Sequence, residues 1–297
     1  MARLFILCIT LLFTNSVFAS KQILNVLVVY DTKTIQEVSE LDTNTEKIAR
    51  AKQIVKDLNR SFSNSGLSSH FEFKLIRTVK STFTDISTSK IPTLLEIGTA
   101  YEGALMLSVE NNRKPFAHLQ VLQKKYKADI VFGIFPEKLG FLNTGQCGIA
   151  THIPNNNLPG GVSSIEEYIE FAGNGIAFLN ANSHCLDKDY LAAHEVGHGM
   201  GLFHGPEIDK SKYDSYKNNM IDSASGKAYI NERVPFFSRG TIMAAKVGSN
   251  FHNYFSDISK SSCGYYESNP CGDNDANAVE VLKKYKESYN KRGDWYK

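Results

Sequence analysis

Residues 194–205 read HEVGHGMGLFHG and combine three histidines and a glutamate at fixed spacings. His194 and His198 are four residues apart, so on a helix both imidazoles project from one face, where they can bind one metal ion. Glu195 follows the first histidine and lies next to the position of a water molecule on that metal. The spacing therefore favours a metal-binding helix over an ordinary amphipathic helix with surface histidines.

The end of the same stretch supplies a third candidate ligand. Gly201 is predicted to end the helix in a left-handed turn, and His204 then returns toward the first two histidines. Three neutral imidazoles leave one coordination position open, which is typical of a catalytic zinc site and not of a closed structural one. We expect one catalytic Zn²⁺ at this position.

Residues 1–19 have the pattern of a secretory signal peptide. Arg3 gives a positive start, residues 4–13 are apolar, and Val17 to Ala19 offer a small-residue cleavage site. The apolar run is too short for a membrane span, and no later stretch reaches about 18 consecutive apolar residues. The pattern predicts a secreted protein, extracellular or periplasmic, with a retained signal anchor as the alternative.

Residues 20–297 are long enough for one large domain. The formal net charge of +2 falls by one when Arg3 is removed, so composition indicates no strong attraction to nucleic acid or to a membrane surface. We expect a monomer that acts on a protein or peptide partner, with no nucleic acid partner.

Four cysteines remain after the signal peptide: Cys147, Cys185, Cys263 and Cys271. An even number in an exported chain predicts two disulfides, for which three pairings exist. Sequence position favours Cys147–Cys185 and Cys263–Cys271. No C-x-x-C pair occurs, so a cysteine-rich zinc site is not expected.

The first half of the sequence alternates predicted strands with predicted helices. The strands are 23–30, 71–79 and 128–135, and the helices are 44–61, 91–109 and 116–126. Leu119, Val121, Leu122 and Tyr126 are the expected apolar face of the last helix. Such alternation is typical of an α/β layer with a mostly parallel sheet.

Two further strands, 148–153 and 175–181, precede the metal-binding helix. If they pair antiparallel, the start of one lies beside the end of the other, which brings Cys147 near Cys185. Asp187 or Asp189 is the expected cap of the metal-binding helix. A long polar stretch, 206–239, follows it, and a final helix is predicted over 274–289.

The motif as a whole resembles the metzincin zinc endopeptidases, whose pattern H-E-x-x-H-x-x-G-x-x-H is matched by His194, Glu195, His198, Gly201 and His204. That family also has a tight turn with methionine beneath the zinc. In this chain, residues 240–245 read GTIMAA, so Met243 resembles the Met-turn residue.

Within the metzincins the chain is similar to the adamalysin, or reprolysin-like, branch, including its bacterial members. The strand beginning Asp129-Ile-Val and the segment Cys147-Gly-Ile-Ala resemble strands that precede the active-site helix there. Gly205 departs from that branch, which usually has Asp after the third histidine. Ala245 stands where astacins and serralysins have a tyrosine, so those branches fit less well.

The resemblance implies an α/β fold with an α+β C-terminal part. It consists of a twisted, mostly parallel five-stranded sheet with an antiparallel edge strand, an active-site helix and a smaller irregular C-terminal subdomain. The subdomain boundary would fall near residues 201 and 202. An extended substrate would pair with the edge strand at Gly148, Ile149 and Ala150.

The implied reaction is hydrolysis of peptide bonds by a zinc-activated water, with Glu195 as general base and then as proton donor to the leaving amine. The first strand starts so soon after Ala19 that no propeptide is expected, which leaves control to export or to a separate protein inhibitor. The alternative function is a zinc-bearing, non-proteolytic binding protein or toxin on the same fold. Calcium at Asp273, Asn274 and Asp275 is a weaker expectation, because these residues can instead cap the final helix.

Overall fold

The structure of the chain is a computed structural model. It describes residues 20–32, 43–82, 114–135, 147–150, 175–181, 183–202, 204, 228–229, 239–244, 250–261 and 270–292. Of the predicted features, the signal peptide, the helix over 91–109, Gly205, Ala245, Cys263 and most of the polar stretch 206–239 lie outside these residues.

Five strands form the main sheet, in the order β2-β1-β3-β5-β4. They are β1 (Gln22–Asp31), β2 (Phe71–Ser81), β3 (Ile130–Phe135), β4 (Gly148–Ala150) and β5 (Ile176–Asn180). Strands β2, β1, β3 and β5 are parallel, whereas β4 runs antiparallel to β5 at the sheet edge. The predicted α/β sheet, mostly parallel with one antiparallel edge strand, is confirmed.

The two faces of this sheet are covered by different helices. In β1, Val26, Val28 and Tyr30 face one hydrophobic cluster, whereas Leu27 and Val29 face the other, as strand alternation requires. Because both faces are buried, β3 is a continuous apolar run and β5 is apolar up to its last residue, Asn180, and every residue of both strands is buried.

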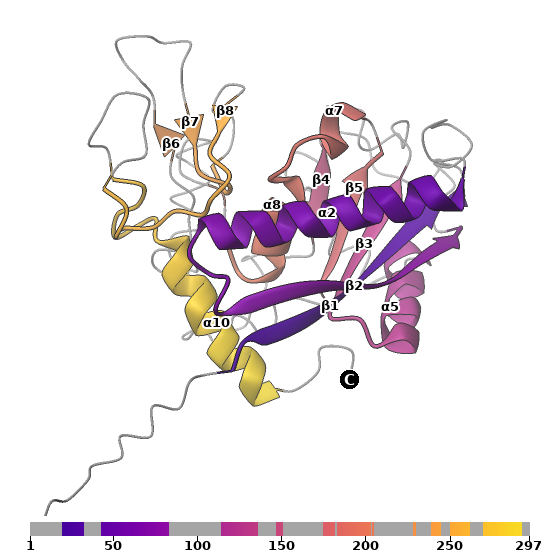
Figure 1. Cartoon of the computed structure of the whole chain (residues 1–297). Helices are drawn as coiled ribbons and strands as arrows, with labels where there is room; N and C mark the ends of the chain where they lie inside the picture. The colour runs from indigo at the N-terminus through magenta and orange to yellow at the C-terminus, as the bar shows by residue number, and fades with distance from the viewer. Residues whose placement is uncertain are drawn as a thin grey trace, which may run out of the picture.

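One long helix, α2 (Asn44–Asn64), runs across the first face (Figure 1). Thr43 and Glu46 form a capping box at its start, which fixes where the helix begins. Its buried stripe ends at Phe62, whose ring makes edge contacts with Phe71, Phe73 and Phe255. The aromatic contact with Phe255 joins α2 to the C-terminal part of the chain.

On the opposite face lies α5 (Lys114–Tyr126), with Leu119 and Leu122 buried against the sheet. The prediction that Val121 belongs to this apolar face is wrong, because its side chain is 63% exposed. Two residues correspond to about 200° of helical rotation, which turns Val121 away from the side that Leu119 buries.

The C-terminal part carries a second, small sheet and a final helix. The sheet has the order β6-β7-β8 and comprises β6 (Ala228–Tyr229), β7 (Arg239–Gly240) and β8 (Asn250–Phe251). The final helix, α10 (Ala278–Arg292), packs Ala278, Val281 and Leu282 into the same cluster as α2. This arrangement is compatible with the smaller C-terminal subdomain that was expected. Among the described residues, no helix is long and apolar enough to cross a membrane.

The residues expected to cap α10 or to bind calcium lie in a turn before the helix. Asp273 accepts a hydrogen bond from the amide of Asp275, at 3.0 Å. The amide of Ala278, the first helical residue, donates instead to Ser256 Oγ at 3.0 Å. Capping of α10 by residues 273–275 is therefore wrong, since the capping oxygen comes from a residue distant in the sequence.

Candidate metal centre

Helix α8 (Leu191–Gly199) carries the first two histidines and Glu195. It packs against α2 on the first face of the sheet, with Ala192, Ala193 and Val196 in the shared hydrophobic cluster. A short helix, α7 (Ser183–Leu186), leads into it (Figure 1). The packing of α8 against α2 and the sheet therefore fixes the direction in which the histidines of α8 point.

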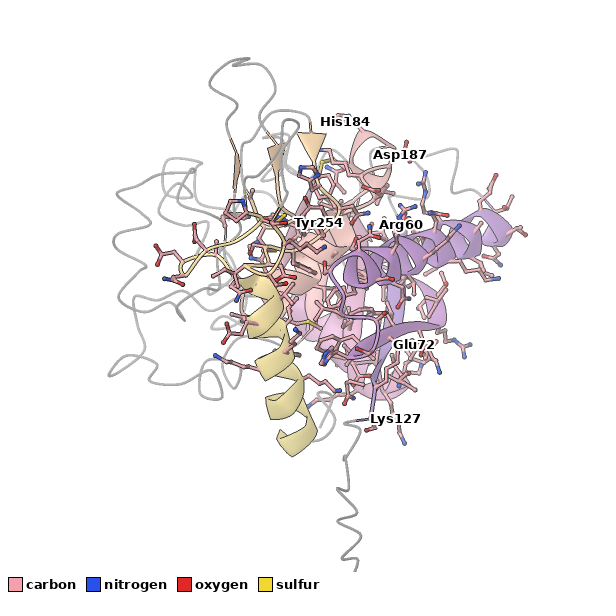
Figure 2. All side chains as sticks on the ribbon, turned by 60° about the vertical axis from the view of Figure 1, so that its left-hand side comes forward. Arg60, Glu72, Lys127, His184, Asp187 and Tyr254 are labelled. Carbon is pink, nitrogen blue, oxygen red and sulfur yellow. A yellow bond between two sulfur atoms is a disulfide. The ribbon has the colours of Figure 1, made fainter. Side chains whose placement is uncertain are left out.

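Capping of α8 by Asp187 or Asp189 is wrong. The residue at the cap position is Tyr190, which makes no side-chain cap hydrogen bond. Asp187 instead pairs with Arg50 of α2, at 2.9 Å, and Asp189 pairs with Arg60, at 3.1 Å. Figure 2 labels Arg60 on α2 and Asp187 after α7. The two acids thus tie the entry of α8 to the neighbouring helix.

The predicted helix-ending turn occurs at Gly201, which has a φ of +89°. The amide of Gly201 donates to the carbonyl of His198 at 3.0 Å, and that of Leu202 donates to the carbonyl of Gly197 at 2.9 Å. Glycine adopts this left-handed conformation without steric cost. The turn reverses the chain, so that His204 comes back to the face of α8 that carries the other two histidines.

The three imidazoles converge through their Nε2 atoms. The Nε2 atom of His194 lies 2.9 Å from that of His204 and 3.2 Å from that of His198, and the third separation is 3.1 Å. A tetrahedral ion with metal–nitrogen bonds of 2.0–2.1 Å would separate its ligand atoms by about 3.3–3.4 Å. The three side chains can therefore hold a metal ion with little rearrangement.

The outer nitrogens of two rings face backbone carbonyls. His194 Nδ1 donates to the carbonyl of Ile242 at 2.7 Å, and His198 Nδ1 donates to that of Leu202 at 2.8 Å. A carbonyl only accepts, so in the neutral rings the protons sit on Nδ1 and the Nε2 lone pairs point at each other. Facing lone pairs repel, and a cation between them removes that repulsion. Burial also lowers the pKa of His194, while its bond to Ile242 acts in the opposite direction, so the neutral form is favoured.

Met243 lies in a turn that packs against α8 at Gly197. The amide of Ala244 donates to the carbonyl of Thr241 at 2.9 Å, which closes the turn, and the Met243 side chain is fully buried. The same turn supplies the Ile242 carbonyl that orients His194. Met243 thus packs against the helix that carries the histidines, and its role as the Met-turn residue beneath a zinc ion stays a prediction.

Glu195 follows His194 on α8 and is buried. Only 4% of its surface is exposed, and this burial raises the pKa of its carboxyl group to about 8. A cation bound by the neighbouring imidazoles would favour the ionised carboxylate again. The protonation state of Glu195 therefore depends on whether the imidazoles hold a cation.

The edge strand β4 lies over Glu195. Gly148 pairs with Leu179 and Ala150 pairs with Ala177 in β5, with Ile149 between them. Residues 151–153 of the predicted strand are outside the described part.

The predicted disulfide between Cys147 and Cys185 is present and joins the start of β4 to α7. Cys271 lies 3.7 Å from the hydroxyl of Tyr254, and its predicted pairing with Cys263 stays a prediction.

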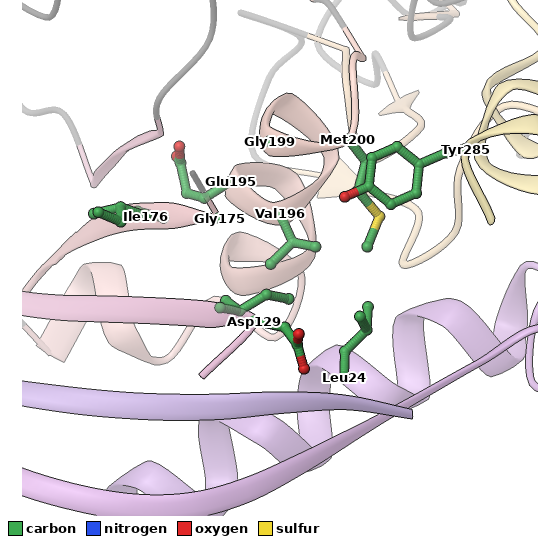
Figure 3. Close-up of a pocket in the computed structure, with 11 residues that line it drawn as sticks. Leu24, Asp129, Gly175, Ile176, Glu195, Val196, Gly199, Met200 and Tyr285 are labelled. Carbon is green, nitrogen blue, oxygen red and sulfur yellow. The ribbon is translucent and has the colours of Figure 1, made fainter. Parts of the chain in front are cut away.

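A small pocket, which Glu195 and Asp129 line together with apolar residues, lies against α8 (Figure 3). There Val196 and Met200 face Leu24 and Tyr285, while the carboxyl group of Glu195 points away from these side chains. Because the lining is largely apolar core, we interpret this pocket as a packing gap between α8, α10 and the sheet.

Three features of the site have no signature in the local sequence: the Ile242 carbonyl that orients His194, and the close contacts of Gly148 and Gly197. A methyl group added at Gly148 would collide with Glu195, and one added at Gly197 would collide with Met243. Each feature joins parts of the chain that are more than 40 residues apart, so no local pattern predicts it. Only the resemblance to a known family pointed to one of them, the contact of Met243.

Comparison with known proteins identifies no family. No family model and no curated protein matches the chain. Among solved structures, a chaperone–substrate complex matches with a TM-score of 0.50 and 18% identity. The match covers 91% of this chain, which spans 35% of the length of the other. At that identity the likeness concerns the fold alone.

Proposed function

We propose that the chain is a secreted zinc-dependent endopeptidase of the metzincin type. The observation that carries the proposal is the convergence of three Nε2 atoms, two of them on rings oriented by backbone carbonyls, beside a buried glutamate. A structural zinc site needs no such glutamate. An open three-histidine site together with a proton acceptor is suited to zinc-assisted hydrolysis of a peptide bond.

Each residue then has a definite role. His194, His198 and His204 would hold the metal ion, which supplies Lewis-acid chemistry when bound. Glu195 accepts the proton of the attacking water and passes it to the leaving amine. The Ile242 and Leu202 carbonyls keep two of the imidazoles in the tautomer that leaves Nε2 available for the metal.

The sheet supports a peptide or protein as substrate. Strand β4 is the edge strand and is paired on one side only, with β5, among the described strands. An extended peptide can add to such an edge by main-chain hydrogen bonds, with its scissile bond near Glu195. The disulfide supports folding in an oxidising compartment, in agreement with the signal-peptide prediction.

The direct test is cleavage of casein by the purified mature chain. We expect cleavage that a chelator abolishes and added Zn²⁺ restores, with about one zinc per chain by elemental analysis. Glu195→Ala should retain the zinc and lose cleavage by at least about 100-fold, because only the proton acceptor is removed. Zinc binding without any cleavage would instead favour a non-proteolytic binding protein, and full activity of Glu195→Ala would refute the assigned base.

A further inference from the structure

Strand β4 touches the side chain of Glu195 directly. A methyl group on Gly148 would lie 2.8 Å from Cδ and 2.9 Å from Cγ of Glu195, and closer still to Oε1. Carbon atoms in contact are normally about 3.5–4.0 Å apart. A side chain at residue 148 would therefore force either the Glu195 side chain or the strand to shift.

The position of β4 is fixed from two directions. The amide of Asn180 in β5 donates to the carbonyl of Cys147 at 2.8 Å, which holds the strand in the sheet. The disulfide from Cys147 to Cys185, with Cα atoms 4.9 Å apart, ties the same point to α7. Since α7 leads within a few residues into α8, the disulfide connects β4 to the entry of the helix that carries Glu195.

The glutamate side chain is held by packing. Its three rotatable bonds would leave the carboxyl group mobile in open space, and within the described part of the chain no hydrogen bond to that group is formed. The carboxyl end of Glu195 is the part nearest to Gly148, so the backbone of β4 blocks any movement of the carboxyl group further in that direction. The strand thus limits where the carboxyl group can lie.

We propose that Gly148 is a positioning residue. Strand β4, held by the Cys147–Cys185 disulfide, limits the positions that the Glu195 carboxyl group can adopt. The catalytic consequence rests on the proposed function, whereas the contact itself does not. A side chain at position 148 would push either the carboxyl group or the strand out of place.

A double-mutant cycle on thermal stability tests the contact without any need for activity. Gly148→Ala should lower the Tm of the otherwise unchanged chain by several degrees. In the Glu195→Ala background the atoms that collide are absent, so the same substitution should cost less than half as much. Equal losses in both backgrounds would overturn the proposal. If Gly148→Ala alone does not fold, recovery of a folded double variant supports it, and failure of both variants overturns it.

Gly133→Ala is the matched control. Gly133 lies in β3, where an added methyl would meet Phe178 and Leu119 at 3.0–3.1 Å and would not touch Glu195. Its loss of Tm should be the same in both backgrounds.

The catalytic consequence is tested with a casein-derived peptide and zinc analysis. Gly148→Ala should keep its zinc and lower kcat by about 10- to 100-fold, because a displacement of about 1 Å has effects of that size. The same substitution should add nothing to the loss in Glu195→Ala. Full kcat in folded Gly148→Ala would overturn the positioning role. If the unchanged chain cleaves nothing, the proposed function fails, and the stability cycle still decides whether β4 positions Glu195.

Discussion

The sulfur atom of Met243 lies against Gly197, in the last turn of the metal-binding helix. A methyl group on Gly197 would come within 2.7 Å of Met243 Sδ, and within 3.2 and 3.3 Å of Phe255 and Leu202. The turn that carries Met243 also provides the carbonyl that orients His194. Helix and turn can approach this closely because Gly197 has no side chain.

Gly197→Ala should therefore disturb the metal site as well as the core. Overpacking of this kind typically costs about 1–3 kcal/mol in free energy of unfolding. We expect a loss in that range in urea unfolding and a weaker affinity for Zn²⁺, because His194 shifts with the turn. Gly199→Ala is the control: nothing lies within 4 Å of its added methyl group. If both variants bind zinc equally and are equally stable, the close packing of Met243 on α8 is not important.

Zinc binding should stabilise the folded chain. A ligand that binds only the folded state adds about 4 kcal/mol when its free concentration is 1,000 times Kd. We expect a chelator to lower the Tm and Zn²⁺ to restore it, as measured by differential scanning calorimetry. His204→Ala removes one of three converging nitrogens, so its Tm should respond far less to either addition. An unchanged response in His204→Ala would exclude it as a ligand.

The disulfide should contribute strongly to stability. Its cysteines are 38 residues apart, and closing a loop of that length removes about 4 kcal/mol of chain entropy from the unfolded state. We expect the double variant Cys147→Ser/Cys185→Ser to lose a comparable free energy of unfolding. Dithiothreitol should destabilise the unchanged chain similarly and leave the double variant unaffected. A Tm insensitive to both changes would contradict this.

The capping box of α2 predicts a pH dependence. Hydrogen bonds from the amide and hydroxyl groups of Thr43, both at 2.8 Å, lower the pKa of Glu46 in the folded state. Its contribution to stability is therefore present above the unfolded-state pKa and is lost as the pH falls through the lower, folded value. The Tm difference between the unchanged chain and Glu46→Gln should shrink between about pH 5 and pH 2. A difference that is constant over this range would argue against the capping role of the charge.

The sequence was sufficient for features that depend on neighbours along the chain. The apolar runs of β1 and β3, the helical spacing of α2 and the left-handed turn at Gly201 are local patterns. The antiparallel edge strand and the Cys147–Cys185 disulfide were also predicted. The disulfide follows from the strand pairing, because antiparallel pairing brings Cys147 close to Cys185. The arrangement of the three histidines is also a local feature, because one helix and one turn bring them together.

The tertiary structure alone decided how that site is supported. Asp189 looked like a helix cap, yet it pairs with Arg60 and accepts a hydrogen bond from Asn253 at 3.0 Å, while the cap of α10 comes from Ser256. The contacts of Gly148 with Glu195 and of Gly197 with Met243 depend on how the strand and the turn pack against α8. Such contacts follow from the packing of elements far apart in the chain, where burial and close approach select partners that no local pattern of residues encodes.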